Sequence, residues 1–227
     1  MSVLGHLEEF RRRSIVALAA WAAGCAIAWP RAPRLLDRLL EPLGQPAVFL
    51  APAEGFMVVF KLDLAAGALL ASPVIAWQVA AFFLPALKRR EKRAVVLAAA
   101  SGVGAFALGA WFAVRFLVPA MMAFFMGFAT ERLRPQITAE RYFGFLLWIA
   151  VGCGAAFEFP VVAGGLAAGG LLRARTLLRH WRPAVMICLV VAALVTPSPD
   201  AASMLMLAVP LLGVWAAGVG AAWALGR

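Results

Sequence analysis

Residues 201–225 read AASMLMLAVPLLGVWAAGVGAAWAL, and no charged side chain interrupts them. An α-helix rises 1.5 Å per residue and the hydrocarbon core of a bilayer is roughly 30 Å thick, so roughly 20 apolar residues are enough to cross it. This stretch is therefore predicted to be a membrane-spanning helix.

The rest of the chain has the same character. Apolar residues make up 64% of the 227 residues and charged residues only 14%, and the mean hydropathy is +0.91. A soluble domain of this size cannot bury so much apolar surface. The composition excludes soluble globular, disordered, collagen-like and disulfide-scaffold proteins, and it predicts an all-α, multi-span membrane protein.

Charged residues divide the chain into six predicted spans within one membrane domain covering residues 1–227, at about 14–30, 56–84, 94–118, 142–172, 181–195 and 201–225. The fifth is unusual, because Pro183 and Pro197 enclose only 12 uninterrupted apolar residues, 184–195. At 1.5 Å each they cover roughly 18 Å, which is too short to cross a bilayer unaided. We expect that neighbouring helices bury this helix or that the bilayer thins around it.

Basic residues alternate between the two sides of the predicted spans. The net charge is +10, and 13 of the 21 Lys and Arg lie in the N-terminal segment, the 2–3 and 4–5 connections and the last residue. The opposite connections hold 6. By the positive-inside rule, both termini are predicted to be cytoplasmic. This asymmetry accounts for the basic pI of about 11.2 without a nucleic-acid partner.

The N-terminus has a competing interpretation. Three arginines, an apolar run and the sequence AAGC at 22–25 resemble a secretory signal with a lipoprotein-type cleavage site. Glu8 and Glu9 do not suit the basic start of such a signal. Its removal would also leave five spans with a spoiled charge alternation, so we retain the first span.

No pattern predicts catalysis or a cofactor. The sequence lacks metalloprotease, nucleophile-elbow and phosphate-loop motifs. Its two histidines, His6 and His180, lie at predicted cytoplasmic ends. All three cysteines lie inside apolar runs, so they are predicted to be small core residues without disulfide or metal spacing.

Two acids lie in otherwise basic cytoplasmic segments. Glu9 is on a predicted interfacial helix at the N-terminus, and Glu91 is the only acid among five bases in the 2–3 connection. Glu9 can pair with Arg13 at i,i+4, as Glu8 can with Arg12, and Glu91 can simply moderate repulsion. Alternatively, Glu9 and Glu91 can bind a cationic partner through charge-assisted hydrogen bonds.

Glu158 lies well inside the fourth predicted span. An ionisable group there costs a few kcal/mol on insertion scales and points to a function or a polar cavity. Pro160 removes a backbone donor close by, which leaves a carbonyl in need of a polar partner. The alternative is a protonated Glu158 that donates a hydrogen bond to a neighbouring helix.

Several motifs, taken in order, resemble the TatC family of twin-arginine translocase subunits. They are HLEEFRRR at 6–13, Pro52-x-Glu54-x-Phe56, FFLPAL at 82–87 with EKR at 91–93, Gly109-x-x-Phe112 with Pro119, Tyr142-x-x-Phe145, Phe157-Glu158-x-Pro160 and TPSPD at 196–200. Single motifs are weak signals, but this ordered set covers nearly the whole chain.

The resemblance implies a cup of six helices in the bacterial cytoplasmic (inner) membrane. Such a protein is expected to bind twin-arginine signal peptides of folded precursor proteins and to recruit single-span TatA- and TatB-type partners. Export would be driven by the protonmotive force. The receptor complex can contain several copies of this chain, as a homo-oligomer. No cofactor is implied.

The resemblance also implies roles for individual residues. The signal-peptide site would contain Glu9, Arg11, Phe82, Pro85, Leu87 and Glu91. An intramembrane docking point would contain Glu158 and Pro160. The extracytoplasmic cap and turn would be shaped by Pro42, Pro52, Phe56 and Asp200.

The chain departs from the family pattern at two places. Val114 stands where an aromatic residue is usual, and the 196–200 turn is one residue longer than the common Thr-Pro-Pro-Asp, which makes the placement of Asp200 less certain. The runner-up function is a small-solute or proton-coupled transporter that uses Glu158. Internal hydropathy symmetry would favour a transporter, and the unequal spans do not have it.

Overall fold

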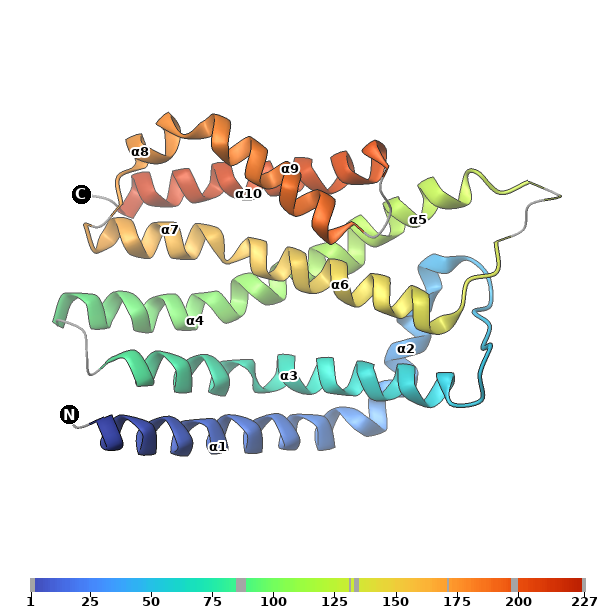
Figure 1. The fold of residues 1–227 in the computed structure, drawn as a ribbon, viewed down its shortest axis with the longest axis horizontal. Helices are drawn as coiled ribbons and strands as arrows, with labels where there is room; N and C mark the ends of the chain where they lie inside the picture. Colours follow the sequence, from blue (N-terminus) through green and yellow to red (C-terminus); the bar gives the residue numbers. More distant parts are fainter. Residues whose placement is uncertain are drawn as a thin grey trace.

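The computed structural model describes residues 3–84, 89–130, 132, 135–170, 172–196 and 200–225, without the side chains of residues 3–5, 83, 89–91, 93, 94 and 97. These parts are almost entirely helical. Within them the only β-type pairing is one isolated bridge between Val48 and Thr138. Long helices lie side by side along the longest axis of the molecule (Figure 1).

The predicted fold class is confirmed, and five helical segments are long and apolar enough to cross a membrane: His6–Leu43, Glu54–Phe82, Ala98–Met126, Ala139–Ala168 and Ala201–Leu225. Helix α9, Trp181–Val195, is the short sixth member, with 15 residues. It has the bounds expected for the fifth span, and 15 residues cover only about 22 Å.

The first span is longer than expected at both ends. Helix α1 runs over Val3–Ala28, so the predicted interfacial helix and the first span are one continuous helix. The 3-10 turn η1, Trp29–Arg31, leads into α2, Ala32–Leu40, and the turn η2, Glu41–Leu43. Pro30, Pro33 and Pro42 lie in the first turns of η1, α2 and η2, respectively. A missing N–H breaks no helical hydrogen bond at these positions.

Helix α3, Glu54–Phe83, packs antiparallel on α1 and contains Pro73 without ending. Helix α4, Arg89–Phe112, continues through a π-helical turn, Ala113–Leu117, into α5, Val118–Met126. The third span therefore reaches beyond the expected end at 118. Pro119 explains the π turn, because it has no N–H and its ring needs extra room in the preceding turn.

The fourth span is divided at its acid. Helix α6, Ala139–Phe157, and helix α7, Phe159–Ala168, meet at Glu158, and Pro160 stands in the first turn of α7. Short helix α8, Ala174–Arg179, follows, and α10, Ala201–Leu225, closes the chain with Pro210 inside it. Helix α10 packs on α7 and α9, and α4 packs on α6.

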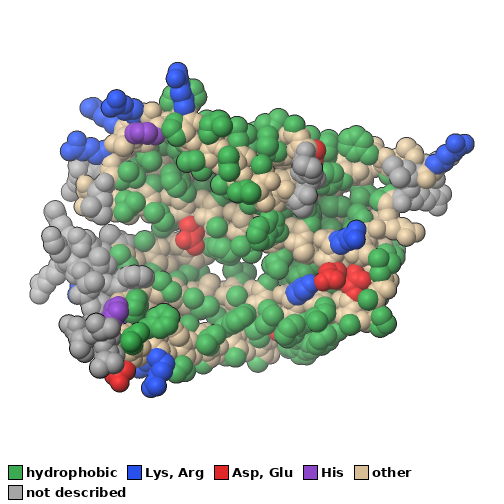
Figure 2. Space-filling view, viewed as in Figure 1, with side chains coloured by type: hydrophobic (Ala, Val, Ile, Leu, Met, Phe, Trp, Pro, Cys, Tyr) green, Lys and Arg blue, Asp and Glu red, His purple; other side chains and the backbone are tan. Residues whose placement is uncertain are grey.

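Both marked termini lie at one end of the bundle, which we call the N/C end, and α2 lies toward the opposite end, the far end (Figure 1). On the face shown, Lys and Arg side chains gather toward these two ends, while the broad middle is mostly apolar (Figure 2). The main buried core lies between α5, α6, α9 and α10 and includes Met121, Ile149 and Leu207.

Two helix crossings depend on glycine. A Cβ atom on Gly24 of α1 would lie 2.5 Å from the carbonyl oxygen of Gly67 on α3. A Cβ atom on Gly109 of α4 would lie 2.6 Å from the carbonyl oxygen of Cys153 and 2.9 Å from the Cα atom of Gly154 on α6. The absence of side chains lets these backbones approach closely, as is common between membrane helices.

Candidate functional site

The N/C end brings the start of α1 beside the end of α3. The ring centroids of His6 and Phe82 are 4.5 Å apart, and those of Phe10 and Phe82 are 5.8 Å apart in an edge-on arrangement. Phe10 is exposed. Two segments separated by more than 70 residues in sequence thus form one surface in which an aromatic face lies beside the acid-bearing turn of α1.

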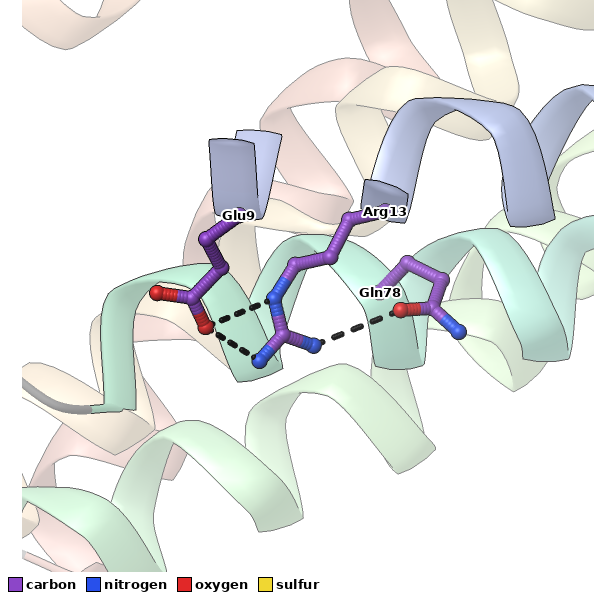
Figure 3. Close-up of polar contacts among 3 residues, drawn as sticks. All are labelled: Glu9, Arg13 and Gln78. Carbon is purple, nitrogen blue, oxygen red and sulfur yellow. Dashed lines mark hydrogen bonds and ion pairs between the residues drawn. The ribbon is translucent and has the colours of Figure 1, made fainter. Parts of the chain in front are cut away.

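Glu9 and Arg13 of α1 and Gln78 of α3 form a hydrogen-bonded chain between the same two helices (Figure 3). The Nε and Nη2 atoms of Arg13 donate to Oε1 of Glu9 at 3.1 and 2.6 Å. Nη1 of Arg13 donates to Oε1 of Gln78 on α3 at 3.3 Å. The local pair predicted for Glu9 therefore forms, and it is tied to the neighbouring helix.

The second local pair is absent. Glu8 and Arg12 are both exposed, and no ion pair joins them in the part of the chain that the structure describes. The physical difference is the third partner, because Gln78 fixes the Arg13 guanidinium, whereas no described side chain on another helix fixes Arg12. An exposed i,i+4 pair alone contributes too little to hold two long side chains.

The Glu9 carboxylate keeps one oxygen for another partner. Both bonds from Arg13 end on Oε1, and no described side chain donates to Oε2. The Glu9 side chain is 15% exposed, so it is partly shielded from water without being sealed from a ligand. A shielded carboxylate held in one orientation is suited to accept charge-assisted hydrogen bonds from a cation.

The other residues expected in this site have different outcomes. Arg11 is on α1 and exposed, without an ion pair to a described side chain. It is two positions after Glu9, and residues at this spacing on a helix do not face each other. Pro85 and Leu87 lie outside the described residues. Glu91 lies in the first turn of α4, and its side chain is outside the description. The structure brings Phe82 against His6 and Phe10, in the turn of α1 that contains Glu9, and all six roles stay predictions.

Glu158 lies at the junction of α6 and α7, opposite Gly102 of α4. A Cβ atom on Gly102 would lie 3.9 Å from Cδ and Oε2 of Glu158, so this glycine leaves room for the carboxyl group. The residue is half-buried, and its side chain has no hydrogen bond or ion pair with any described residue. The predicted hydrogen bond to a neighbouring helix is thus not found among these residues.

The place of Glu158 in the bundle is fixed by its backbone. Its N–H donates to the carbonyl of Ala155 at 3.2 Å, and its own carbonyl accepts from the N–H of Val162 at 3.0 Å. Helix α7 has 10 residues, so Glu158 lies about 15 Å along the helix from the end of α7. The result is a carboxyl group without a polar partner at the depth of the apolar spans.

At the far end, Glu54 joins three chain segments, and it is the residue that the sequence interpretation passed over. Its Oε2 accepts from the N–H of Leu50 at 2.8 Å, and its Oε1 accepts from the N–H of Glu140 at 3.1 Å. Nζ of Lys61 lies 2.5 Å from Oε1 of Glu140. The position of Glu54 at the start of α3 did not reveal this role, because neither N–H group belongs to the helix that Glu54 begins.

The remaining far-end residues have plain structural positions. Pro52 lies in the exposed turn before α3, and Phe56 is exposed and stacks on Phe60 with centroids 5.8 Å apart. Asp200 precedes α10, where Oδ1 accepts from the N–H of Ser203 at 2.7 Å and Oδ2 from its hydroxyl at 2.5 Å. Asp200 therefore caps the helix despite the longer turn before it.

Asp63 of α3 is a second acid that the sequence interpretation did not single out. It is 4% exposed, and its Oδ1 has no hydrogen-bond partner in the described part of the chain. The Cys25 thiol on α1 lies within hydrogen-bonding reach of the carboxyl group. The available signal was its charge inside an apolar run.

Comparisons with known proteins place these features in context. The family "Sec-independent protein translocase protein (TatC)" matches residues 5–210. Proteins of that name from Koribacter versatilis (strain Ellin345) and Synechocystis sp. are 32% and 31% identical, over 98% and 100% of this chain and 85% and 90% of theirs. A chloroplastic protein of that name from Oryza sativa subsp. japonica is 34% identical, over 98% of this chain and 62% of its own.

Solved structures are similar along the full chain. A crystal structure described as "Twin Arginine Translocase Receptor- TatC" has a TM-score of 0.78 at 30% identity and covers 96% of this chain and 97% of that one. A second, of the same receptor in DDM, has a TM-score of 0.81 at 30% identity, with coverages of 98% and 99%.

Proposed function

The chain belongs to the TatC family of Sec-independent protein translocase proteins, and on this premise we propose that it binds twin-arginine signal peptides through Glu9. The family is a translocase component and not an enzyme, and the chain is a multi-pass membrane protein. Its bacterial relatives fit a location in the bacterial inner membrane. The small-solute transporter considered from the sequence is not needed to explain these features.

The observation that carries the proposal is the held carboxylate at the N/C end. Arg13 and Gln78 fix Oε1 of Glu9 while Oε2 stays available. A guanidinium group carries five donors in a planar fork, so one arginine of the signal can donate to Oε2 without displacing Arg13. The exposed ring of Phe10, the residue next to Glu9 in sequence, is suited to a cation–π contact with the second arginine.

A second acid completes the charge balance of the proposed site. Arg13 already neutralises Glu9, so two further guanidinium groups need more negative charge than Glu9 supplies. Glu91, in the first turn of α4, is the carboxylate that we assign to this role, and Arg11, Pro85 and Leu87 form the rest of the proposed surface. Both termini would then face the cytoplasm, as the distribution of bases predicts.

Crosslinking of a twin-arginine precursor to membranes tests the recognition role of Glu9. Loss of a hydrogen bond to a charged group costs about 1.5–3 kcal/mol, so Glu9→Gln should weaken precursor binding roughly 10- to 100-fold. Glu8→Gln is the matched control, because Glu8 is the neighbouring acid, exposed and outside the Arg13 pair. Undiminished crosslinking in Glu9→Gln would remove Glu9 from the site.

We further propose that Glu158 receives a polar group from a TatA- or TatB-type single-span helix. Its carboxyl group has no partner among the described residues and is half-buried, and the missing side chain of the buried Gly102 leaves room beside it. Pro160 supports the site, because it lacks an N–H and stands directly after the junction of α6 and α7 at which Glu158 lies.

Co-purification of single-span partners in mild detergent tests this docking role. Glu158→Gln keeps the shape and replaces the carboxyl group by an amide, and we expect it to reduce the co-purified partner about tenfold. Glu41→Gln changes an exposed acid at the far end and should leave the amount unchanged. Equal recovery from Glu158→Gln and wild type would reduce Glu158 to a packing role.

A further inference from the structure

An apolar groove runs along the last turns of α10 beneath α8. Its volume is about 480 Å³, and it is lined by Leu178 of α8 and by residues of α10 that include Trp215, Val219, Gly220 and Trp223. Gly220 leaves it open, because a Cβ atom there would have no heavy atom within 4 Å. The groove lies at the N/C end of the spans, and a helix of the length of α10 that crosses a bilayer has its last turns near the headgroups.

Helix α8 holds basic side chains at the edge of this groove. Ala174 of α8 is buried with Ala167 and Ala222, and Leu177 packs against them, so the helix is fixed on α7 and α10. Arg175 and Arg179 stand three residues before and one residue after Leu178, which lines the groove. Both are exposed, and neither makes an ion pair with a described side chain.

The chain segment that contains α8 carries only positive charge. Between Glu158 and Asp200 the sequence contains four arginines and no acidic residue. On the face shown in Figure 2, Lys, Arg and His side chains gather at the corner where Figure 1 places α8, directly beside apolar surface. A ligand that fits this place must combine a negative headgroup with an apolar body.

We propose that the groove binds an anionic phospholipid, with its phosphate on Arg175 and Arg179 and an acyl chain along α10. Guanidinium groups bind phosphate through paired hydrogen bonds, and basic pockets between membrane helices recognise anionic headgroups. Trp223 is 74% exposed, and its indole ring suits the headgroup level. This inference does not depend on signal-peptide binding, because it uses neither Glu9 nor Glu158.

Native mass spectrometry of the full chain in detergent, titrated with phosphatidylglycerol or phosphatidylcholine, tests the proposal. Wild type should retain phosphatidylglycerol in preference to phosphatidylcholine. Gly220→Leu fills the groove and should reduce the phosphatidylglycerol adduct at least about fivefold, which corresponds to about 1 kcal/mol. Gly213→Leu is the matched control, because Gly213 is also on α10, is also open to a Cβ atom, and does not line the groove.

A second pair of variants separates a specific headgroup site from general positive charge. Arg175→Gln with Arg179→Gln should reduce the phosphatidylglycerol adduct to a similar extent. Arg34→Gln with Arg38→Gln removes two exposed arginines at the same spacing on α2 and should not. Far-UV circular dichroism and elution volume should match wild type for all four variants.

Three results would overturn the proposal. Equal retention of the two lipids would show that the headgroup charge is not recognised. Equal losses in the two arginine pairs would show that only total charge matters. Unchanged phosphatidylglycerol binding in Gly220→Leu would exclude the groove as the lipid site and leave it to a partner helix.

Discussion

Gly67→Leu is expected to separate α1 from α3 and to produce the largest loss of stability of any single change considered for this chain. A Cβ atom at Gly67 would lie 2.7 Å from the backbone nitrogen and 2.9 Å from the Cα atom of Cys25. A side chain can rotate away from such a contact, but backbone cannot without moving the whole helix. We expect a cost of about 3 kcal/mol or more, at the upper end of the range for overpacked interfaces.

Thermal unfolding in detergent, followed by tryptophan fluorescence, measures this effect. A loss of 3 kcal/mol corresponds to a fall in Tm on the order of 10 °C for a chain of this length. Gly104→Leu is the control, because Gly104 lies inside α4 and has no heavy atom within 4 Å of the added Cβ atom. An unchanged Tm for Gly67→Leu would contradict the close crossing.

The same substitution should also affect the N/C end. Among the described residues, Gln78 is the hydrogen-bond partner of Arg13 on α3, so a displaced α1 would break the 3.3 Å hydrogen bond that orients the Glu9 pair. Precursor crosslinking is therefore expected to fall in Gly67→Leu although the substitution is far from the acid in sequence. Crosslinking that persists while Tm falls would show that the α1 turn acts without α3.

Asp63→Leu is expected to have the opposite sign and to raise the stability. The carboxyl group is 4% exposed with Oδ1 unpaired among the described residues, and an unsatisfied buried polar group costs about 1–3 kcal/mol. Leucine branches at the same position and needs no hydrogen bond, so it removes the penalty with little change of shape. We expect Tm to rise by several degrees, about 2–4 °C for each kcal/mol.

Two controls separate polarity from size at this position. Asp63→Asn keeps the shape and leaves a polar group to be satisfied, so its Tm should stay below that of Asp63→Leu. Asp37→Leu replaces an exposed acid on α2 and should bring no gain. A lower Tm for Asp63→Leu would show that the carboxyl group has a stabilising partner after all, with the Cys25 thiol as the first candidate.

The positions of the membrane helices could be predicted from the sequence, because the length of an apolar stretch is a local property. The expected bounds of the two C-terminal spans, 181–195 and 201–225, coincide with α9 and α10. Two prolines have different effects on the longer spans. A π turn accommodates Pro119 and the helix continues past the expected end at 118, whereas Pro160 stands in the first turn of α7, directly after the junction at Glu158.

The candidate site could be predicted only in part. The spacing of Glu9 and Arg13 predicts their pair, but it predicts the pair of Glu8 and Arg12 equally well. Only the contact with Gln78, 65 positions away along the chain, distinguishes them. Glu54 shows the same limit, because its partners at Leu50 and Glu140 meet only after α6 returns to the far end.

The sequence by itself determined that residues 201–225 and the other apolar stretches are membrane helices, because burial of apolar length in lipid needs no partner. It also determined the charge asymmetry between the two ends. The tertiary structure alone decided which glycines lie at helix crossings. It also decided which acids have hydrogen-bond partners among the described residues and which do not. These outcomes depend on distances between helices, and lipid offers the helices little drive to associate, so close packing and specific hydrogen bonds decide them.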